Sequence, residues 1–168
     1  MSMNYRVFET RLGWACMYGQ NDLASGLMLP LESKEQILKA VGEGMPGGAV
    51  ETKHDFQIII EQLSAYFAGE KVEFDCGLDL SAGSSFDREV WEAARSIPFG
   101  ETRSYGWIAD KISRPNASRA VGGALGRNLI PVVVPCHRVL RTDGALGGFS
   151  AGLDWKVRLL ALEGVSDK

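Results

Sequence analysis

The first thirty residues predict short β-strands, because short apolar runs alternate there with turn-forming residues. The expected strands are Tyr5–Phe8, Gly13–Tyr18 and Gly26–Leu29, and Gln20–Asp22 is one of the turns between them. A short helix near Glu32–Val41 is expected to follow.

A longer amphipathic helix is predicted over His54–Ala68, with Gly69 at its C-terminal end. Its apolar residues recur at helical spacing, at Phe56, Ile59, Ile60, Leu63 and Phe67. No pattern in this half suggests catalysis. We therefore expect a small α/β domain over residues 1–83, with a structural role, and a second domain over 84–168 that begins after the loop 81–85.

The second half has a helical pattern. An apolar stripe begins at Phe86, and Ser84 and Asp87 have the spacing of an N-terminal capping box. Helices are predicted over Ser104–Ile112 and Ala117–Gly126, with Ser104 and Asn116 as N-cap residues. The length and spacing suit a helix-turn-helix, and a plain helical hairpin fits equally well.

The second of these helices has an unusual glycine content. Arg119, Gly122, Gly123 and Gly126 share one face, opposite the apolar residues Ala117, Val121, Ala124 and Leu125. Each glycine inside a helix costs about 1 kcal/mol relative to alanine. A face without side chains allows close approach, either of another helix or of an external object such as a DNA minor groove.

Composition and charge change the picture only locally. The 168 residues are 45% hydrophobic and 23% charged, which suits one compact domain or two small ones. The net charge is −3, yet residues 98–141 alone have a net charge of +5, which indicates either a phosphate-contacting surface or uneven surface charge without meaning. No apolar run has the ~20 residues of a membrane span, and the N-terminus does not resemble a secretory signal. A cytoplasmic protein, or a nuclear one if the source is eukaryotic, is expected.

The chemistry-bearing segment surrounds Cys136. Pro131 and Pro135 enclose three valines, which predicts a short, buried, extended piece before Cys136 and His137. A thiol needs a base or a positive charge to be a good nucleophile at neutral pH. Adjacent residues of an extended chain point in opposite directions, so these two side chains can pair directly only if the chain turns; otherwise a water must relay the proton. A buried cysteine that only packs is the alternative.

The other cysteines and the other histidine give little evidence for a disulfide or a metal site. Three cysteines and two histidines do not suit a disulfide scaffold or an ordinary metal site, so no metal is expected. Whether Cys16 and Cys76 pair or bind metal stays open.

Several sequence blocks resemble those of the O6-alkylguanine-DNA alkyltransferases, also called methylated-DNA–protein-cysteine methyltransferases. The active-site signature is Pro135-Cys-His-Arg-Val139, and the other blocks are Phe86–Trp91, Pro98–Tyr105, Ser118–Ala124, Gly126–Asn128, Gly147–Ser150 and Leu160–Gly164. The N-terminal half, with Leu12–Trp14 and Leu27–Pro30, is similar to the smaller domain of the family more loosely.

The resemblance implies a ribonuclease-H-like α/β domain followed by a mostly helical domain with a helix-turn-helix. It also implies direct-reversal DNA repair: one irreversible transfer of an alkyl group from O6-alkylguanine, and less certainly O4-alkylthymine, after base flipping. No cofactor is implied. The implied partner is double-stranded DNA with the lesion, bound through its minor groove by a monomer.

The resemblance also implies a role for each matching residue. Cys136 accepts the alkyl group, His137 takes its proton through a water, and Glu163 orients that histidine. Tyr105 assists the leaving group and base flipping, Arg119 fills the vacated base stack, and Asn128 links the second helix to the active-site segment. The implied DNA-binding residues are Ser104, Tyr105, Arg119, Ala120, Gly122 and Gly123.

The same resemblance implies a pocket for the guanine. The backbone carbonyls of Cys136 and Val139 would bind its amino group, and the N–H of Ser150 would point at O6. The lid over the pocket runs from Gly147 to Gly152 and includes Phe149, Ser150 and Ala151. Phe149 replaces the tyrosine of some relatives and keeps a stacking surface, and Ala151 replaces the usual glycine and adds one methyl group at the rim of the pocket.

Three other functions compete with repair. Alkyltransferase-like proteins bind the lesion without repairing it, but they replace the acceptor cysteine, typically with tryptophan, whereas Cys136 is present here. A helix-turn-helix regulator could use Cys136 as a redox sensor. That function would not explain the presence of the other matching residues, Tyr105, Arg119, Asn128 and Glu163. A cysteine hydrolase would turn over a simple ester.

Overall fold

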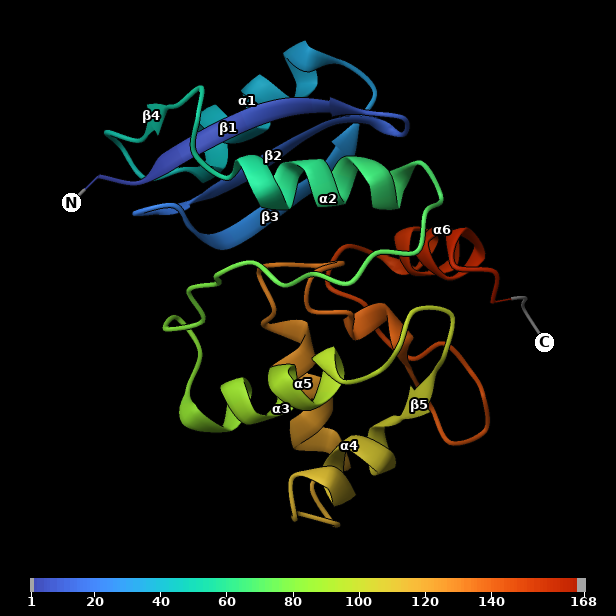
Figure 1. Ribbon diagram of the computed structural model, residues 1–168. Helices are drawn as coiled ribbons and strands as arrows, with labels where there is room; N and C mark the ends of the chain where they lie inside the picture. The colour runs from blue at the N-terminus through green and yellow to red at the C-terminus, as the bar shows by residue number, and fades with distance from the viewer. Residues whose placement is uncertain (1, 166–168) are drawn as a thin grey trace. The chain divides into compact units, whose positions relative to one another are not determined.

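The computed structural model describes residues 2–165 and divides into two compact units, Met1–Asp79 and Leu80–Lys168. The outermost residues of the two predicted domains, Met1 and 166–168, lie outside the described residues. The first unit contains a small mixed sheet with two helices, and the second is mostly helical, as the sequence predicted (Figure 1).

The N-terminal unit is built on a four-stranded sheet in the order β3-β2-β1-β4. Its strands are β1 (Asn4–Thr10), β2 (Gly13–Gln20), β3 (Leu23–Leu31) and β4 (Val50–Glu51). The first three run antiparallel and contain the predicted strands, each with additional residues. Strand β4 pairs parallel with β1 and was not predicted, because two exposed residues have no detectable apolar pattern.

Two helices pack on this sheet. Helix α1 (Lys34–Gly44) packs Ile37 and Val41 against Cys16, and a capping box from Ser33 begins it. Helix α2 (Gln57–Phe67) lies on the other side of the strands (Figure 1). It begins three residues later than predicted, because Phe56 has a left-handed backbone with φ of 62°.

The C-terminal unit packs α3 (Ser85–Arg95), α4 (Tyr105–Lys111) and α5 (Ser118–Gly126) against one another. After α5 follow the 3₁₀-helix η1 (Cys136–Arg138) and helix α6 (Leu153–Leu162). Strands β5 (Arg103–Ser104) and β6 (Val139–Leu140) pair in parallel, which joins the start of α4 to the end of η1. The first turn of α4 therefore lies beside the Cys136 segment.

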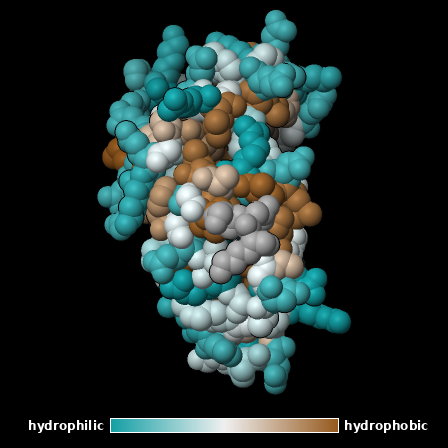
Figure 2. All heavy atoms as spheres, turned by 90° about the vertical axis from the view of Figure 1, so that its right-hand side faces the viewer, coloured by the Kyte–Doolittle hydropathy of each residue, from teal (hydrophilic) through white to brown (hydrophobic). Residues whose placement is uncertain are grey.

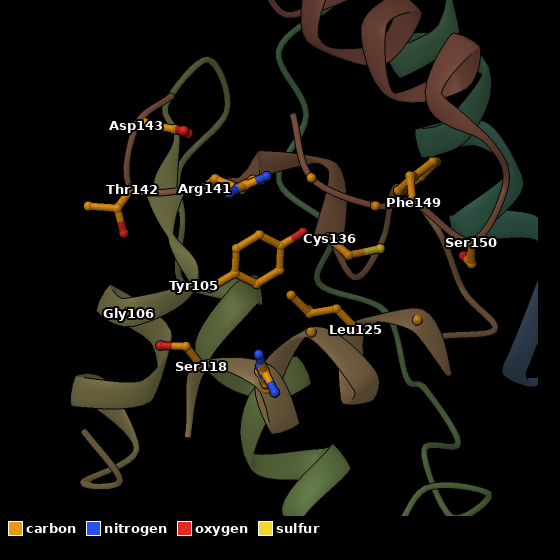
Figure 3. A pocket seen from close by; sticks show the side chains of 15 residues that line it. Tyr105, Gly106, Ser118, Leu125, Cys136, Arg141, Thr142, Asp143, Phe149 and Ser150 are labelled. Carbon is orange, nitrogen blue, oxygen red and sulfur yellow. The ribbon is translucent and has the colours of Figure 1, made fainter. Parts of the chain in front are cut away.

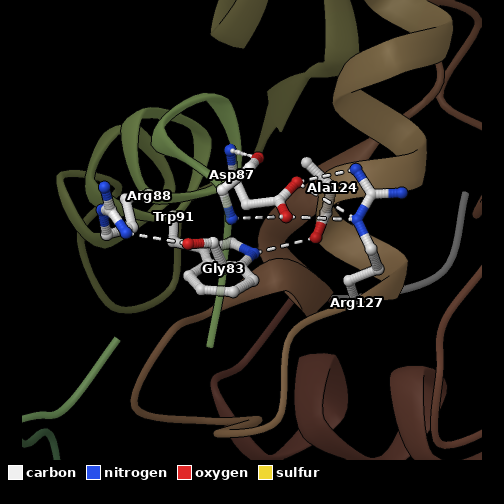
Figure 4. Close-up of polar contacts among 7 residues, drawn as sticks. Gly83, Asp87, Arg88, Trp91, Ala124 and Arg127 are labelled. Atoms are coloured by element: carbon white, nitrogen blue, oxygen red, sulfur yellow. Dashed lines mark hydrogen bonds and ion pairs between the residues drawn. The ribbon is translucent and has the colours of Figure 1, made fainter. Parts of the chain in front are cut away.

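Two predicted helix starts are confirmed and one is wrong. Ser84 and Asp87 form the capping box of α3, and the Ser104 hydroxyl accepts the Trp107 N–H at 3.0 Å. Asn116 does not cap α5: the N-cap residue is Ala117, and no side chain bonds to the first turn. Helix α5 is anchored at its other end instead, where Trp91 Nε1 donates to the Ala124 carbonyl at 2.8 Å (Figure 4).

The valine segment before Cys136 is buried as predicted, but it is not extended. The Val134 N–H donates to the Ile130 carbonyl at 3.0 Å, and Val132 has a φ of 75°. The chain therefore makes a buried turn here, because the polar groups of the segment are bonded to one another and to Asn128 rather than to a neighbouring strand.

Helix α6 is buried along one side only. Lys156, Leu159 and Leu160 are buried, whereas Leu153 and Val157 are exposed. Figure 2 shows the face turned to the right in Figure 1, where brown, apolar atoms lie among the teal, hydrophilic ones.

Candidate functional site

The thiol of Cys136 is held by an asparagine at the end of α5. Asn128 Nδ2 donates to Cys136 Sγ at 3.0 Å and to the Val134 carbonyl at 3.1 Å. Asn128 Oδ1 accepts the Ile130 N–H at 2.9 Å, so the amide of this buried residue spans the whole turn that leads to Cys136. A shift of this turn would therefore move both the end of α5 and the thiol.

The environment of Cys136 acts on the thiol in two directions. Burial raises the pKa of the thiol, whereas the Asn128 hydrogen bond and the positive charge of Lys156 oppose that rise. Only 3% of Cys136 is exposed. A thiolate here forms when a base removes the proton, and the asparagine amide then stabilises the anion.

The base next in the chain is His137, which is fully buried against Glu163. His137 Nε2 bonds to the Glu163 carboxylate, so Nδ1 is the ring nitrogen that can accept a proton. Burial lowers the pKa of His137, and this keeps the imidazole neutral at pH 7. The chain turns at η1, so the side chains of Cys136 and His137 are not held in opposite directions as they would be in an extended segment.

The carboxylate of Glu163 is the centre of a larger buried network. Arg138 Nε donates to it at 2.8 Å and Arg138 Nη2 at 3.2 Å, and the Gly100 N–H donates at 2.9 Å. Burial alone would raise the pKa of Glu163, but the bonds from His137, Arg138 and Gly100 prevail and lower it to about 2. The carboxylate is therefore ionised at neutral pH and orients His137.

A buried lysine, Lys156, which was not predicted from the sequence, binds backbone carbonyls next to the pocket. The Lys156 ammonium, with no exposed surface, donates to the carbonyls of Val139 at 2.7 Å, Gly148 at 3.1 Å and Leu146. Burial lowers its pKa to about 8. Lysines on helices usually face water, so nothing in the local pattern of α6 could have distinguished this one.

A pocket of about 880 Å³ opens over Cys136 between α4, α5 and the segment 141–150 (Figure 3). Seven of the predicted site residues line it: Tyr105, Arg119, Gly122, Cys136, Gly147, Phe149 and Ser150. Gly148, which lies within the predicted lid, lines it as well. Seven further lining residues were not predicted: Gly106, Ser118, Leu125, Gly126, Arg141, Thr142 and Asp143.

The other predicted site residues lie outside this lining. Asn128 is buried against the Cys136 thiol, and His137, which follows Cys136 in the chain, forms a buried pair with Glu163. Ala120 and Gly123 are exposed on α5, and Ser104 is half-buried at the start of α4. Val139, Ala151 and Gly152 also do not line it. The Val139 carbonyl accepts from Lys156, and the Cys136 carbonyl accepts the Val139 N–H.

Tyr105 stands in the middle of the pocket, with its hydroxyl towards the side of Cys136 (Figure 3). A Cβ atom at Gly147 would lie 2.5 Å from the Tyr105 hydroxyl oxygen, and Gly147 has a φ of +69°. Both facts require glycine at this position. Burial raises the pKa of Tyr105, so its hydroxyl stays protonated and can donate a hydrogen bond.

The glycine-rich face of α5 is open. A Cβ atom at Gly126 would meet nothing within 4 Å, and one at Gly122 would lie 3.8 Å from the Tyr105 ring, an ordinary contact. Close packing against another helix therefore does not explain these two glycines within residues 2–165.

Metal-binding and membrane-spanning features are both absent from residues 2–165. This part of the chain contains no group of three or more histidine, cysteine or acidic residues that could hold a metal ion. In the same range, no helix is long and apolar enough to cross a membrane.

The architecture of the chain is shared with a known class of proteins. A family profile described as "6-O-methylguanine DNA methyltransferase, DNA binding domain" matches residues 85–165. The methylated-DNA–protein-cysteine methyltransferase of Mycolicibacterium paratuberculosis is 45% identical over 161 residues, which cover 96% of this chain and 92% of the relative. The chain belongs to the 6-O-methylguanine DNA methyltransferase family.

Solved structures agree with this assignment. The crystal structure of Mycobacterium tuberculosis OGT in complex with DNA has a TM-score of 0.80 and 41% identity, covering 95% of this chain and 92% of the other. The O6-methylguanine-DNA methyltransferase of Pyrococcus kodakaraensis strain KOD1 has a TM-score of 0.76 and 25% identity, covering 96% and 99%.

Proposed function

We propose that this protein repairs DNA by moving an alkyl group from O6 of a guanine to Sγ of its own Cys136, once per molecule. The observation that carries the proposal is the thiol of Cys136 at the wall of the 880 Å³ pocket, bonded to Asn128 and followed in the chain by the buried His137–Glu163 pair. The mycobacterial relative named above acts, by its name, on methylated DNA and a protein cysteine.

The chemistry needs no group beyond those of the site. The thiol proton passes by way of a water to His137 Nδ1, and Glu163 stabilises the resulting imidazolium. The thiolate attacks the alkyl carbon: an S–C bond forms, the C–O6 bond breaks, and its electron pair passes to O6 of guanine. Tyr105 donates a hydrogen bond to the leaving guanine. The product thioether has no good leaving group, so the protein is consumed.

The target base must leave the duplex to reach this pocket, which costs a few kcal/mol. We assign α4 and α5 as a helix-turn-helix and place α5 in the minor groove, because the open face at Gly122 and Gly126 fits a narrow groove. Arg119, which lines the pocket mouth, fills the gap left by the base. The exposed Ala120 and Gly123 and the half-buried Ser104 contact the adjacent DNA backbone.

The pocket residues then recognise the flipped guanine. The Cys136 and Val139 carbonyls accept from its amino group, and the Ser150 N–H donates to O6. Phe149 supplies a stacking surface in the lid that runs from Gly147 to Gly152.

The two units have different tasks in this proposal. The N-terminal unit, which we assign to the ribonuclease-H-like type, is structural. The C-terminal unit contains every group that meets DNA or the alkyl carbon. We propose a monomer that works in the cytoplasm, where the DNA of bacteria and archaea, the sources of its relatives, is found.

Intact mass after mixing with a duplex that contains O6-methylguanine tests the proposal. We expect a gain of one methyl group on Cys136, one equivalent per protein, and no gain in Cys136→Ser. Steady turnover beyond one equivalent, or a methyl group elsewhere, would refute the single-use mechanism. Arg119→Ala should lose more rate on the methylated duplex than on free O6-benzylguanine, and equal losses would exclude a role in flipping.

A further inference from the structure

A second arginine lies on the open face of α5, outside the pocket lining. Arg127 follows Gly126 directly and ends the helix, and its side chain is 58% exposed. The guanidinium nevertheless has a fixed orientation, because the buried carboxylate of Asp87 on α3 holds it (Figure 4). A fixed arginine on an exposed helix surface is unusual, since such side chains otherwise keep their rotamer freedom.

The ion pair uses only part of the guanidinium. Arg127 Nε donates to both carboxylate oxygens of Asp87 at 3.2 Å, and Nη2 donates to one of them at 2.6 Å. No group within residues 2–165 accepts a hydrogen bond from Nη1. The two Nη1 protons therefore remain for an external acceptor.

The position of Nη1 relates this free edge to the glycine face. A Cβ atom at Gly123 would lie 3.3 Å from Arg127 Nη1, so the guanidinium passes over Gly123. Any side chain at 123 would press against it. The absence of a side chain at Gly123 therefore leaves room for the arginine, and the free edge of Arg127 lies on the face that we assign to the minor groove.

We propose that Arg127 binds a phosphate of the DNA backbone through Nη1 while Asp87 holds the rest of the guanidinium in place. The inference rests on the proposed function, because it needs α5 to lie against DNA. A backbone phosphate is the expected ligand because it is anionic, recurs along the groove wall and accepts hydrogen bonds from one edge of a guanidinium. The Asp87 carboxylate orients the arginine before DNA arrives, so binding of the phosphate costs little side-chain entropy.

A purely structural role is the competing explanation. Asp87 is buried and its pKa is lowered, first of all by the hydrogen bonds from Arg127, so the pair also stabilises the junction of α3 and α5. Stability measurements alone cannot separate the two roles. The salt dependence of DNA binding can, because removal of one cation–phosphate interaction lowers the slope of log K against log salt by about 0.9.

The experiment measures binding of the full chain to an undamaged duplex at several salt concentrations. Arg127→Gln and Asp87→Asn both break the same ion pair, but only Arg127→Gln removes the cation that meets the phosphate. We expect a slope smaller by about 0.9 in Arg127→Gln and an unchanged slope in Asp87→Asn. Arg95→Gln, which removes an arginine paired with Glu92 on α3, is the charge-matched control and should keep the slope.

The double variant Asp87→Asn/Arg127→Gln keeps the wild-type net charge and leaves no buried carboxylate unpaired. It can therefore replace Arg127→Gln in the binding measurement if the single variant folds poorly. The slope of the double variant should also fall by about 0.9. The inference is overturned if Arg127→Gln and the double variant both keep the wild-type slope, or if the slope decreases equally in Arg127→Gln and Asp87→Asn. Neither result would contradict the proposed function. Absence of any salt-dependent binding by the wild-type protein would overturn the proposed function as well.

Discussion

Replacement of Glu163 by glutamine tests the buried network beneath the active-site thiol. The carboxylate accepts hydrogen bonds from His137, Arg138 and Gly100, and its pKa falls from an ordinary 4.5 to about 2. Each unit of pKa is worth about 1.4 kcal/mol, so the ionised carboxylate stabilises the fold by about 3 kcal/mol. Loss of one partner from a buried ion pair costs about 3–5 kcal/mol, which agrees in size.

The lowered pKa also sets the direction of the pH dependence. The stabilisation by Glu163 is complete above pH 4.5 and is lost as the pH falls towards about 2, because the unfolded chain takes up the proton first. The lowered pKa of His137 acts in the same direction: below 6.5 its unfolded form gains a proton that the folded form does not take up. The wild-type protein should therefore lose stability as the pH falls below 6.5.

Urea unfolding at pH values from about 7 down to about 3 measures this effect. Tryptophan fluorescence suits the purpose, because three of the four tryptophans lie in residues 80–168. Glu163→Gln should be less stable than wild type by about 3 kcal/mol at pH 7, and the gap should narrow below pH 4.5. The control Glu101→Gln, an exposed partner of Arg103, should lose less than about 1 kcal/mol. A gap that stays constant down to pH 3 would refute the assignment of the stabilisation to the ionised carboxylate.

Three further changes test other parts of the site. Gly126→Leu should melt no lower than wild type, because nothing lies within 4 Å of its Cβ position, yet bind undamaged DNA several-fold more weakly; unchanged affinity would argue against α5 in the groove. Lys156→Met should lower the free energy of unfolding by more than about 2 kcal/mol, because three carbonyls lose a charged donor, and wild-type stability in urea would contradict this role. Asn128→Ala should raise the pKa of the Cys136 thiol, seen as slower alkylation by iodoacetamide at neutral pH, and an unchanged pH profile would exclude stabilisation of the thiolate by the amide.

Most of the elements could be predicted because their causes are local. A capping box such as Ser84–Asp87 is complete within one helical turn, and the apolar periodicity of α2 and α3 shows which face is buried. Local signals failed where the backbone leaves the common conformations. The left-handed Phe56 shortens α2, and Val132, a β-branched residue at positive φ, turns a segment that reads as a strand.

The sequence by itself determined that Cys136 and His137 are adjacent and that positive charge gathers over residues 98–141. Through the family resemblance it also named seven of the residues that line the pocket. Only the tertiary structure decided what surrounds them: Gly100 meets Glu163 across 63 positions, Asp87 holds Arg127 across 40, and Lys156 reaches three carbonyls of the pocket wall. Such interactions depend on the path of the chain through a buried turn, and a buried charge is stable only where that path brings its partners within hydrogen-bond distance. The distance between residues that are far apart in the chain cannot be derived from their order and spacing in the sequence.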